Sequence, residues 1–240
     1  MTHENEQVDI IAFGAHPDDV EISAGGLVAK EAELGYRVGI IDLTRGEMGS
    51  RGTPEERAVE AREAAEILGL AWRKNFGLPD GEFEVSQENI LLVARALRLY
   101  RPKIIILPYW EDRHPDHVRA SLLIQEAHFK AGLKKVLPEL PPYRPQIMIF
   151  YFLNKIVPQS FVVDVSAVYE KKWNSLLAHK SQFVRTKLKD PALLGAREPL
   201  KFIESRDSYY GSQIGVKYGE PFLIKTPVPL DDPMQVWCKG

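Results

Sequence analysis

Residues 10–19 read IIAFGAHPDD and join an apolar run of strand length to a polar cluster. Central strands of a parallel sheet are covered on both faces, so they are apolar throughout, and this run is typical of them. His16, Asp18 and Asp19 follow the end of the run. A histidine and two adjacent carboxylates are costly to bury, and an α/β protein presents its chemistry at strand ends. The stretch therefore predicts an α/β fold with a functional site at the exit of the first strand.

The bulk composition is that of an ordinary globular protein. The chain has 240 residues, which suits one α/β domain, and 45% of them are hydrophobic. A formal net charge of −2 argues against a nucleic-acid partner. No apolar stretch approaches the roughly 20 residues of a membrane helix, and no signal peptide is visible. Because Cys238 is the single cysteine, no intramolecular disulfide can form, and we expect a cytoplasmic protein without a membrane partner.

Apolar runs of strand length alternate with helical patterns over most of the chain. This alternation predicts a doubly wound, Rossmann-like, mostly parallel sheet with helices on both faces. We expect one domain over residues 1–240, with residues 1–7 flexible and residues 221–240 forming an irregular C-terminal elaboration, because prolines there prevent a regular helix. The strands are expected over residues 8–15, 36–44, 71–76, 103–107, 146–153 and 161–165, and the helices over residues 22–34, 54–69, 86–100, 118–132, 167–180 and 200–213.

A second polar cluster, HPDH at residues 114–117, follows the strand expected over residues 103–107. In the common doubly wound order, the first strand lies beside the strand that begins the second half of the sheet, and ligands bind in the crevice between them. The two clusters should therefore meet. Two imidazoles and one carboxylate are a common ligand set for catalytic zinc and also suit iron(II). This reasoning predicts a metal site formed by His16, Asp19 and His117.

The remaining polar residues of the two clusters suit the chemistry of such a site. Asp18 is left over beside the metal, where a carboxylate is the natural general base for an activated water molecule. His114 could donate to a developing oxyanion if it is protonated. Asp116 could orient His114 or a metal-binding histidine. Taken singly, each cluster has a structural explanation, since His-Pro-Asp is commonly a turn and an aspartate before a helix is commonly an N-cap.

Other candidate features are expected to be structural. Gly25 and Gly26 lie inside a helix and lack the Gly-x-Gly-x-x-Gly spacing, so a dinucleotide site is not expected. His128 and His179 lie within helical patterns and are interpreted as structural or solvated. The glycine-rich residues 45–53 form a long connection after the second strand, and such connections are often functional.

At this point the sequence resembles a known family. The paired motifs, HPDD at residues 16–19 and HPDH at residues 114–117, look like those of the LmbE/PIG-L-type zinc deacetylases, which act on N-acetylglucosaminyl compounds. The resemblance covers nearly the whole chain. It is closest to the branch that serves bacillithiol biosynthesis, and that closer match is carried by residues 42–53, 75–81, 109–117 and 215–222.

The resemblance implies a role for each motif residue. It makes His16, Asp19 and His117 the metal ligands and Asp18 the general base that later protonates the leaving amine. It makes His114 the residue that stabilises the tetrahedral intermediate. The implied reaction is deacetylation of N-acetylglucosaminyl malate with zinc, in a homo-oligomer, often a hexamer among relatives.

The resemblance also implies a sugar site. Arg57, at the start of the helix after the glycine-rich loop, matches the arginine that the family places there, and Glu47, Asp80 and Ser23 match positions that line the sugar pocket in relatives. A guanidinium can grip a hydroxyl pair at two points, although Glu60 at i+3 could instead pair with Arg57. The family often adds a tyrosine at the pocket mouth, and Tyr109, Tyr210 and Tyr218 are all candidates.

Two other functions are compatible with these residues. One is hydrolysis of a larger amide, such as a thiol-sugar conjugate, or of another N-acetyl sugar at the same metal site. The other is a metal-free module that binds a sugar or a nucleotide. The second is disfavoured because the adjacent Asp18 and Asp19 would repel each other without a cation.

Overall fold

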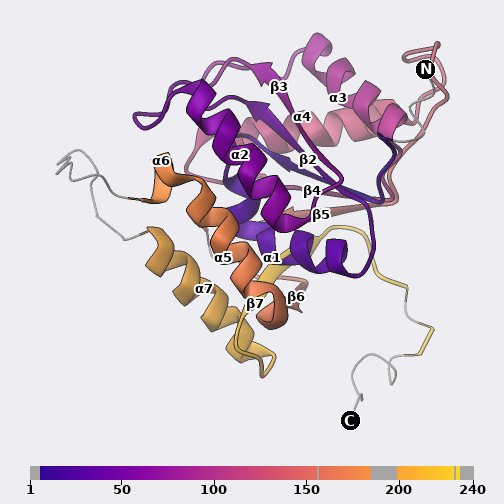
Figure 1. Ribbon diagram of the computed structural model, residues 1–240. Coiled ribbons are helices and arrows are strands. Elements are labelled where there is room, and N and C mark those ends of the chain that lie inside the picture. The colour runs from indigo at the N-terminus through magenta and orange to yellow at the C-terminus, as the bar shows by residue number, and fades with distance from the viewer. Residues whose placement is uncertain (1–5, 156, 185–198, 230, 233–240) are drawn as a thin grey trace.

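The computed structural model describes residues 6–155, 157–184, 199–229 and 231–232. Residues 1–5, part of the segment expected to be flexible, and Cys238 therefore lie outside the described residues. Within the described part of the chain, one seven-stranded sheet is flanked by helices on both faces (Figure 1). None of the helices described there is both long and apolar enough to cross a membrane.

The elements alternate in the predicted way. The strands are β1 (Ile10–Gly14), β2 (Val38–Thr44), β3 (Trp72–Leu78), β4 (Ile104–Pro108), β5 (Ile147–Tyr151), β6 (Phe161–Asp164) and β7 (Gly219–Ile224). The helices are α1 (Asp19–Glu33), α2 (Pro54–Leu68), α3 (Gln87–Tyr100), α4 (Pro115–Ala131), α5 (Tyr169–Ala178), α6 (Lys180–Phe183) and α7 (Pro199–Gln213), with a short 3₁₀ turn, η2 (Ser166–Val168).

The strand order is β3-β2-β1-β4-β5-β7-β6. The chain builds outward from β1 to β3 and then returns to place β4 on the other side of β1. Both pairings of β1 are parallel, with Ile10 opposite Val38 of β2 and Ile104 of β4. The order therefore reverses between β1 and β4, which confirms the predicted doubly wound sheet and its crevice.

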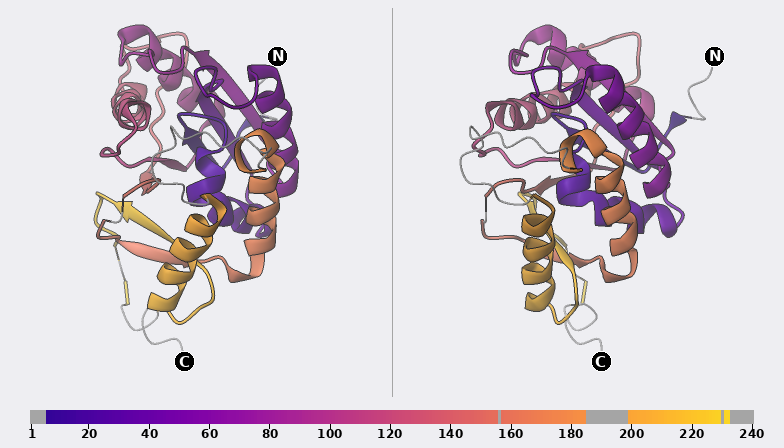
Figure 2. Two further views of the ribbon diagram at one scale, coloured as in Figure 1. Left: turned by 90° about the vertical axis from the view of Figure 1, so that its left-hand side faces the viewer. Right: turned by 60° about the vertical axis from the view of Figure 1, so that its left-hand side comes forward.

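Each face of the sheet has its own apolar core. Side chains alternate along a strand, so Ile11 and Phe13 of β1 point toward α3 and α4, while Ile10 and Ala12 point toward α1 and α5. Figure 2 shows α7 packed against β7, the strand that extends the sheet beyond β5. The continuously buried β1 and β2 explain why their sequences are apolar throughout.

The expectation of an irregular tail is wrong for residues 221–224. These residues belong to β7, which runs antiparallel between β5 and β6. Pro221 is tolerated because it lies opposite Val162 of β6 and beyond the last residue of β5 that pairs with β7. The missing N–H of proline therefore removes no hydrogen bond to β5. Proline spacing excludes a helix but does not exclude this kind of strand.

Three helices have boundaries that differ from expectation. Both α1 and α4 begin three residues earlier than expected, at Asp19 and Pro115, so each polar cluster spans the N-terminus of a helix. The helix expected over residues 167–180 is interrupted at His179, which separates α5 from α6. In contrast, the start of α2 follows its sequence signals, with Thr53 and Glu56 forming a reciprocal capping box.

Gly25 and Gly26 allow the C-terminal part of the chain to approach α1 closely. A Cβ atom on Gly26 would lie 2.7 Å from Val165 Cβ and 3.0 Å from Glu220 Oε1. The buried Glu220 carboxylate of β7 accepts hydrogen bonds from the backbone N–H groups of Gly26 and Leu27. The glycine pair that fails as a dinucleotide motif is thus a packing feature.

We predict that Gly26→Ala lowers the free energy of unfolding by about 1–3 kcal/mol, because the added methyl group overpacks the contact with Val165. Gly25→Ala is the matched control in the same helix, since its nearest neighbour is Cγ of the buried Lys172 at 3.3 Å, a milder contact than the 2.7 Å at Gly26. It should be nearly neutral, because the gain of about 1 kcal/mol that alanine brings to a helix offsets this milder contact. Urea unfolding of both variants provides the measurement, and equal stabilities would contradict the close-packing argument.

Candidate active site

The first polar cluster forms a tight turn between β1 and α1. Asp19 is the first residue of α1, and its Oδ2 atom accepts hydrogen bonds from the backbone N–H groups of Ala15 at 2.9 Å and His16 at 3.0 Å. These bonds leave Oδ1 facing the crevice, 3.3 Å from Nε2 of His117. The turn therefore directs one oxygen of Asp19 inward while the other holds the backbone.

The second cluster lies at the start of α4, after the loop of residues 109–114 that follows β4. His114 is the N-cap, and its Nδ1 atom accepts a hydrogen bond from the backbone N–H of Asp116 at 3.2 Å. His117 follows in the first turn. Because β1 and β4 are neighbours, ligand atoms of His16, Asp19 and His117 all lie within 4.8 Å of one another, and all three residues are buried. The predicted metal-binding set is thus brought together.

Each of the two buried histidines has a carboxylate at its second ring nitrogen. Nε2 of His16 lies 3.0 Å from Oδ1 of Asp80 and 3.4 Å from Oδ2 of Asp116. Nδ1 of His117 lies 3.1 Å from Oδ1 of Asp112. Metal-binding histidines commonly have this arrangement, because the carboxylate fixes the orientation of the ring and raises its basicity.

The electrostatics of the cluster favour a bound cation. Burial would lower the pKa of His16, but hydrogen bonds to Asp116 and Asp19 outweigh it and raise this pKa to about 12. The Asp19 carboxylate is the main cause that raises the pKa of His117 to about 9, although burial acts in the opposite direction. Four carboxylates lie within 3.6 Å of the two imidazoles, and a single guanidinium, that of Arg119, pairs with one of them among the described residues. The donor types, their burial and this negative charge all fit a divalent metal.

Asp18 lies beside this set without belonging to it. Burial raises the pKa of Asp18 to about 6, against the opposing effect of the Arg57 guanidinium, whose Nη2 atom is 3.6 Å from Oδ1 of Asp18. A carboxyl group with a pKa near neutrality is suited to both accepting and returning a proton.

A cavity of about 900 Å³ opens onto these residues. One side of the cavity is formed by His16, His117, Asp18, Asp19 and His114. The opposite side comes from α6, the start of α7 and the segment after β5. Among the described residues, that side is formed by Leu153, Asn154, Gln182, Phe183, Pro199, Phe202 and Ile203. The size is within the range of cavities that take small molecules.

The residues expected to line the sugar pocket have different surroundings. Arg57 and Asp80 line the cavity, whereas Glu47 and Ser23 are not among its lining residues. Glu47 is exposed and accepts a hydrogen bond from the backbone N–H of Asp80 at 2.9 Å. Ser23 is buried inside α1. A sugar-binding role for these four residues stays a prediction.

None of the three candidate tyrosines is among the described residues that line the cavity. Tyr210 is buried, and Tyr218 stacks on Tyr169 with ring centroids 3.6 Å apart. Tyr109 packs between Trp110 and Phe152.

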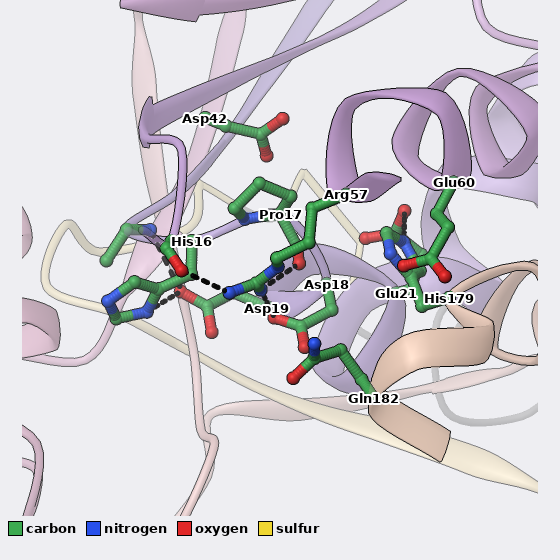
Figure 3. A network of polar contacts seen from close by, with 12 residues as sticks. His16, Pro17, Asp18, Asp19, Glu21, Asp42, Arg57, Glu60, His179 and Gln182 are labelled. Carbon is green, nitrogen blue, oxygen red and sulfur yellow. Dashed lines mark hydrogen bonds and ion pairs between the residues drawn. The ribbon is translucent and has the colours of Figure 1, made fainter. Parts of the chain in front are cut away.

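Several functional candidates were missed in the sequence. Asp112 and Arg113 directly precede the HPDH motif, so their position beside a candidate catalytic motif was an available signal. Gln182 and Phe183 carried no such signal, because α6 reaches the cavity only through tertiary packing. Behind the site, His179 is buried and its Nε2 atom lies 2.9 Å from Glu21 of α1 (Figure 3).

We predict that Asp112→Asn lowers the affinity for zinc by about 10–100-fold, because the histidine it orients loses its carboxylate partner. Titration calorimetry on protein stripped of metal measures this effect. Glu111→Gln is the matched control, since the exposed Glu111 carboxylate pairs only with Lys155 among the described residues, at 2.8 Å. Equal zinc affinities for the two variants would show that Asp112 does not support the site.

The chain is similar to deacetylases over most of its length. The family profile described as "PIG-L: GlcNAc-PI de-N-acetylase" matches residues 11–128. A diacetylchitobiose deacetylase of Thermococcus kodakarensis is 29% identical over 231 residues, which cover 90% of this chain and 82% of that protein. A 1D-myo-inositol 2-acetamido-2-deoxy-alpha-D-glucopyranoside deacetylase 2 of Saccharopolyspora erythraea is 30% identical over 191 residues, which cover 64% and 67%.

The fold is shared with solved structures. The crystal structure of a conserved protein from Thermus thermophilus has a TM-score of 0.85 and 40% sequence identity, over 93% of this chain and 97% of that one. Both polar motifs, residues 16–19 and 114–117, lie within residues 11–128, the segment that the family profile matches. The observed fold and the convergence of the two motifs are consistent with that match. The chain therefore belongs to the PIG-L/LmbE family of de-N-acetylases.

Proposed function

We propose that this protein is a metal-dependent hydrolase that removes the acetyl group from an N-acetylglucosaminyl conjugate, with N-acetylglucosaminyl malate as the preferred substrate. The observation that carries this proposal is the convergence of His16, Asp19 and His117 beside Asp18 at the base of one cavity. The names of the two curated relatives support an N-acetylated glucosamine as the reacting sugar.

The residues that would hold the metal are His16, Asp19 and His117, with zinc favoured by the two imidazoles and iron(II) also compatible. When bound, such an ion supplies Lewis acidity, which activates water and polarises the acetamide carbonyl. The surrounding carboxylates, Asp80, Asp112 and Asp116, hold the two imidazoles in orientation.

Asp18 would carry the proton in both halves of the reaction. It accepts a proton as water adds to the acetyl carbon and the new C–O bond forms. It then returns that proton to the sugar nitrogen as the C–N bond breaks, which releases acetate and the free amine. The pKa of about 6 that burial gives Asp18 suits both steps near neutral pH.

His114 can stabilise the developing oxyanion without being protonated. Its Nδ1 atom already accepts a hydrogen bond from the backbone N–H of Asp116, so the neutral ring carries its proton on Nε2. Burial, together with the nearby His117, lowers the pKa of His114, which favours this neutral form. The sequence-based expectation of a protonated donor is thus not required.

Arg113 supports an acidic aglycone. This exposed side chain lines the cavity next to His114. A guanidinium binds carboxylates at two points, and malate carries two carboxylates. Hydrolysis of a larger thiol-sugar conjugate stays an alternative for the same site, and a homo-oligomer, often a hexamer among relatives, and a cytoplasmic location stay predictions.

Chelation and mutation of the base test the reaction together. A strong chelator should abolish acetate release, and added zinc should restore it. Asp18→Asn should retain zinc but lose about 100- to 10,000-fold in kcat, because the proton acceptor is removed. Acetate release and metal content are measured on the same preparation. Near-native activity in Asp18→Asn would refute the general-base role, and purified protein that neither contains nor responds to zinc would favour the metal-free module.

Product analysis tests the aglycone. Wild-type protein should deacetylate N-acetylglucosaminyl malate with a higher kcat/KM than methyl N-acetylglucosaminide. Arg113→Gln should reduce kcat/KM for the malate conjugate by about 10-fold, the loss expected for a charge-assisted hydrogen bond of about 1.5 kcal/mol. The uncharged methyl glycoside is the internal control and should be unaffected. Equal losses on both substrates would exclude recognition of malate by Arg113, and a preference for a thiol-sugar conjugate in direct competition would support the alternative.

A further inference from the structure

The guanidinium of Arg57 is enclosed by main-chain atoms. Arg57 lies in the first turn of α2 and is only 4% exposed. Its Nη1 atom donates to the carbonyl oxygen of Gly46 at 3.1 Å, and its Nη2 atom donates to the carbonyl oxygen of Pro17 at 2.7 Å. Figure 3 shows the side chain reaching from α2 to the turn that carries Pro17, Asp18 and Asp19. Arg57 therefore connects the glycine-rich loop to the catalytic turn.

The Pro17 carbonyl belongs to the peptide plane immediately before Asp18. Rotation of this plane about the N–Cα bond of Asp18 is the φ angle of that residue, which is 132° with a ψ of −22°. This conformation is uncommon for a residue with a side chain, and such conformations persist only where the surrounding structure enforces them. A hydrogen bond that holds the Pro17 carbonyl thus restrains the angle that directs the Asp18 side chain.

The glycine-rich loop is shaped around the same guanidinium. A Cβ atom on Gly46 would lie 1.9 Å from Nη1 and 2.5 Å from Cζ of Arg57. A Cβ atom on Gly49 would lie 3.3 Å from Nη1. Gly46 also has a φ of +69°, which favours glycine. Because Gly46 and Gly49 have no side chains, the guanidinium can approach the loop closely enough for the Gly46 carbonyl oxygen to accept a hydrogen bond from Arg57.

Part of the guanidinium is committed to the main chain. Two of its five N–H groups are used by the Gly46 and Pro17 carbonyls. Its Nη2 atom also lies 3.6 Å from the Asp18 carboxylate. The same side chain lines the cavity, so the contacts with the catalytic turn do not exclude a contact with substrate.

We propose that Arg57 is a positioning residue for Asp18, acting through the Pro17 peptide. This assignment is additional to the sugar-site role that the family resemblance implies. It rests on the proposed function in so far as Asp18 is the base of that reaction. A base displaced by about 1 Å can cost on the order of 100-fold in rate, so the effect of losing Arg57 should fall on kcat.

Steady-state kinetics separate the two roles. Arg57→Gln should lower kcat for N-acetylglucosaminyl malate by about 100-fold and leave KM within about threefold. Arg57→Lys should recover part of kcat, since one donor can still reach the Pro17 carbonyl. Arg62→Gln, at an exposed arginine of the same helix, is the control and should behave as wild type. An increase in KM with kcat unchanged, or no kinetic effect, would overturn the proposal.

A change on the opposite side of the contact keeps Arg57 itself intact. Gly46→Ala should displace the guanidinium and reproduce the loss of kcat, because the added methyl group would occupy its position. Gly35→Ala is the matched control, since Gly35 also has a positive φ, of +90°, but has no atom within 4 Å of an added Cβ. If Gly46→Ala kept the kcat of Gly35→Ala, the contact would not position the base.

A crystal structure tests the inference independently of the reaction. In Arg57→Gln, Asp18 should leave the positive-φ region and its carboxylate should turn away from the metal-binding residues. Asp18 retained near a φ of 132° in that variant would overturn the inference, whatever substrate is hydrolysed. Wild-type protein that releases no acetate from any N-acetyl sugar would instead refute the proposed function and leave this structural outcome to decide the role of Arg57.

Discussion

The parallel pairing of β1 with β4 is the constraint on which the site depends. Each strand is followed by a helix whose start carries a polar cluster, and strand pairing places the two helix starts side by side. His16, Asp19 and His117 converge for that reason, although almost a hundred residues separate the two motifs. Reversal of strand order is the general device by which an open α/β sheet creates a binding crevice, and this protein uses it to assemble a ligand set.

Charge is the second constraint. Four carboxylates, from Asp19, Asp80, Asp112 and Asp116, lie within 3.6 Å of ring nitrogens of two buried imidazoles, and only Asp116 is also paired with a guanidinium, that of Arg119, among the described residues. Such a surplus is costly in a low-dielectric interior unless a cation balances it, which is why the donor set fits a divalent metal so well. The same surplus separates the roles of the two adjacent aspartates. Asp19 is tied to the turn and to His117, while Asp18 is held apart beside Arg57.

Support for the site comes from parts of the chain that are distant in sequence. Glu220 of β7 binds backbone N–H groups of α1, and buried Lys172 of α5 pairs with Glu220 at 2.7 Å. Glu21 of α1 is held by His179 from the α5–α6 corner. The C-terminal elaboration therefore anchors the helix that carries the catalytic turn, and the close approach at Gly26 is required for that contact. The proline spacing of residues 221–240 predicts only an irregular tail, because sequence periodicity does not indicate which strand a short apolar segment will pair with.

The fold class, the doubly wound order and the meeting of the two histidine motifs could be predicted from the sequence. These features follow from local signals: apolar runs, helix caps and polar residues at strand ends. Three features required the folded structure: β7 enters the sheet, Asp80 and Asp112 lie within 3.1 Å of ring nitrogens of His16 and His117, and Glu47 and Ser23 lie off the cavity. It also surrounded Arg57 with main-chain carbonyls. Which groups a long side chain meets depends on loop paths and helix packing, and neither is encoded in spacing along the chain.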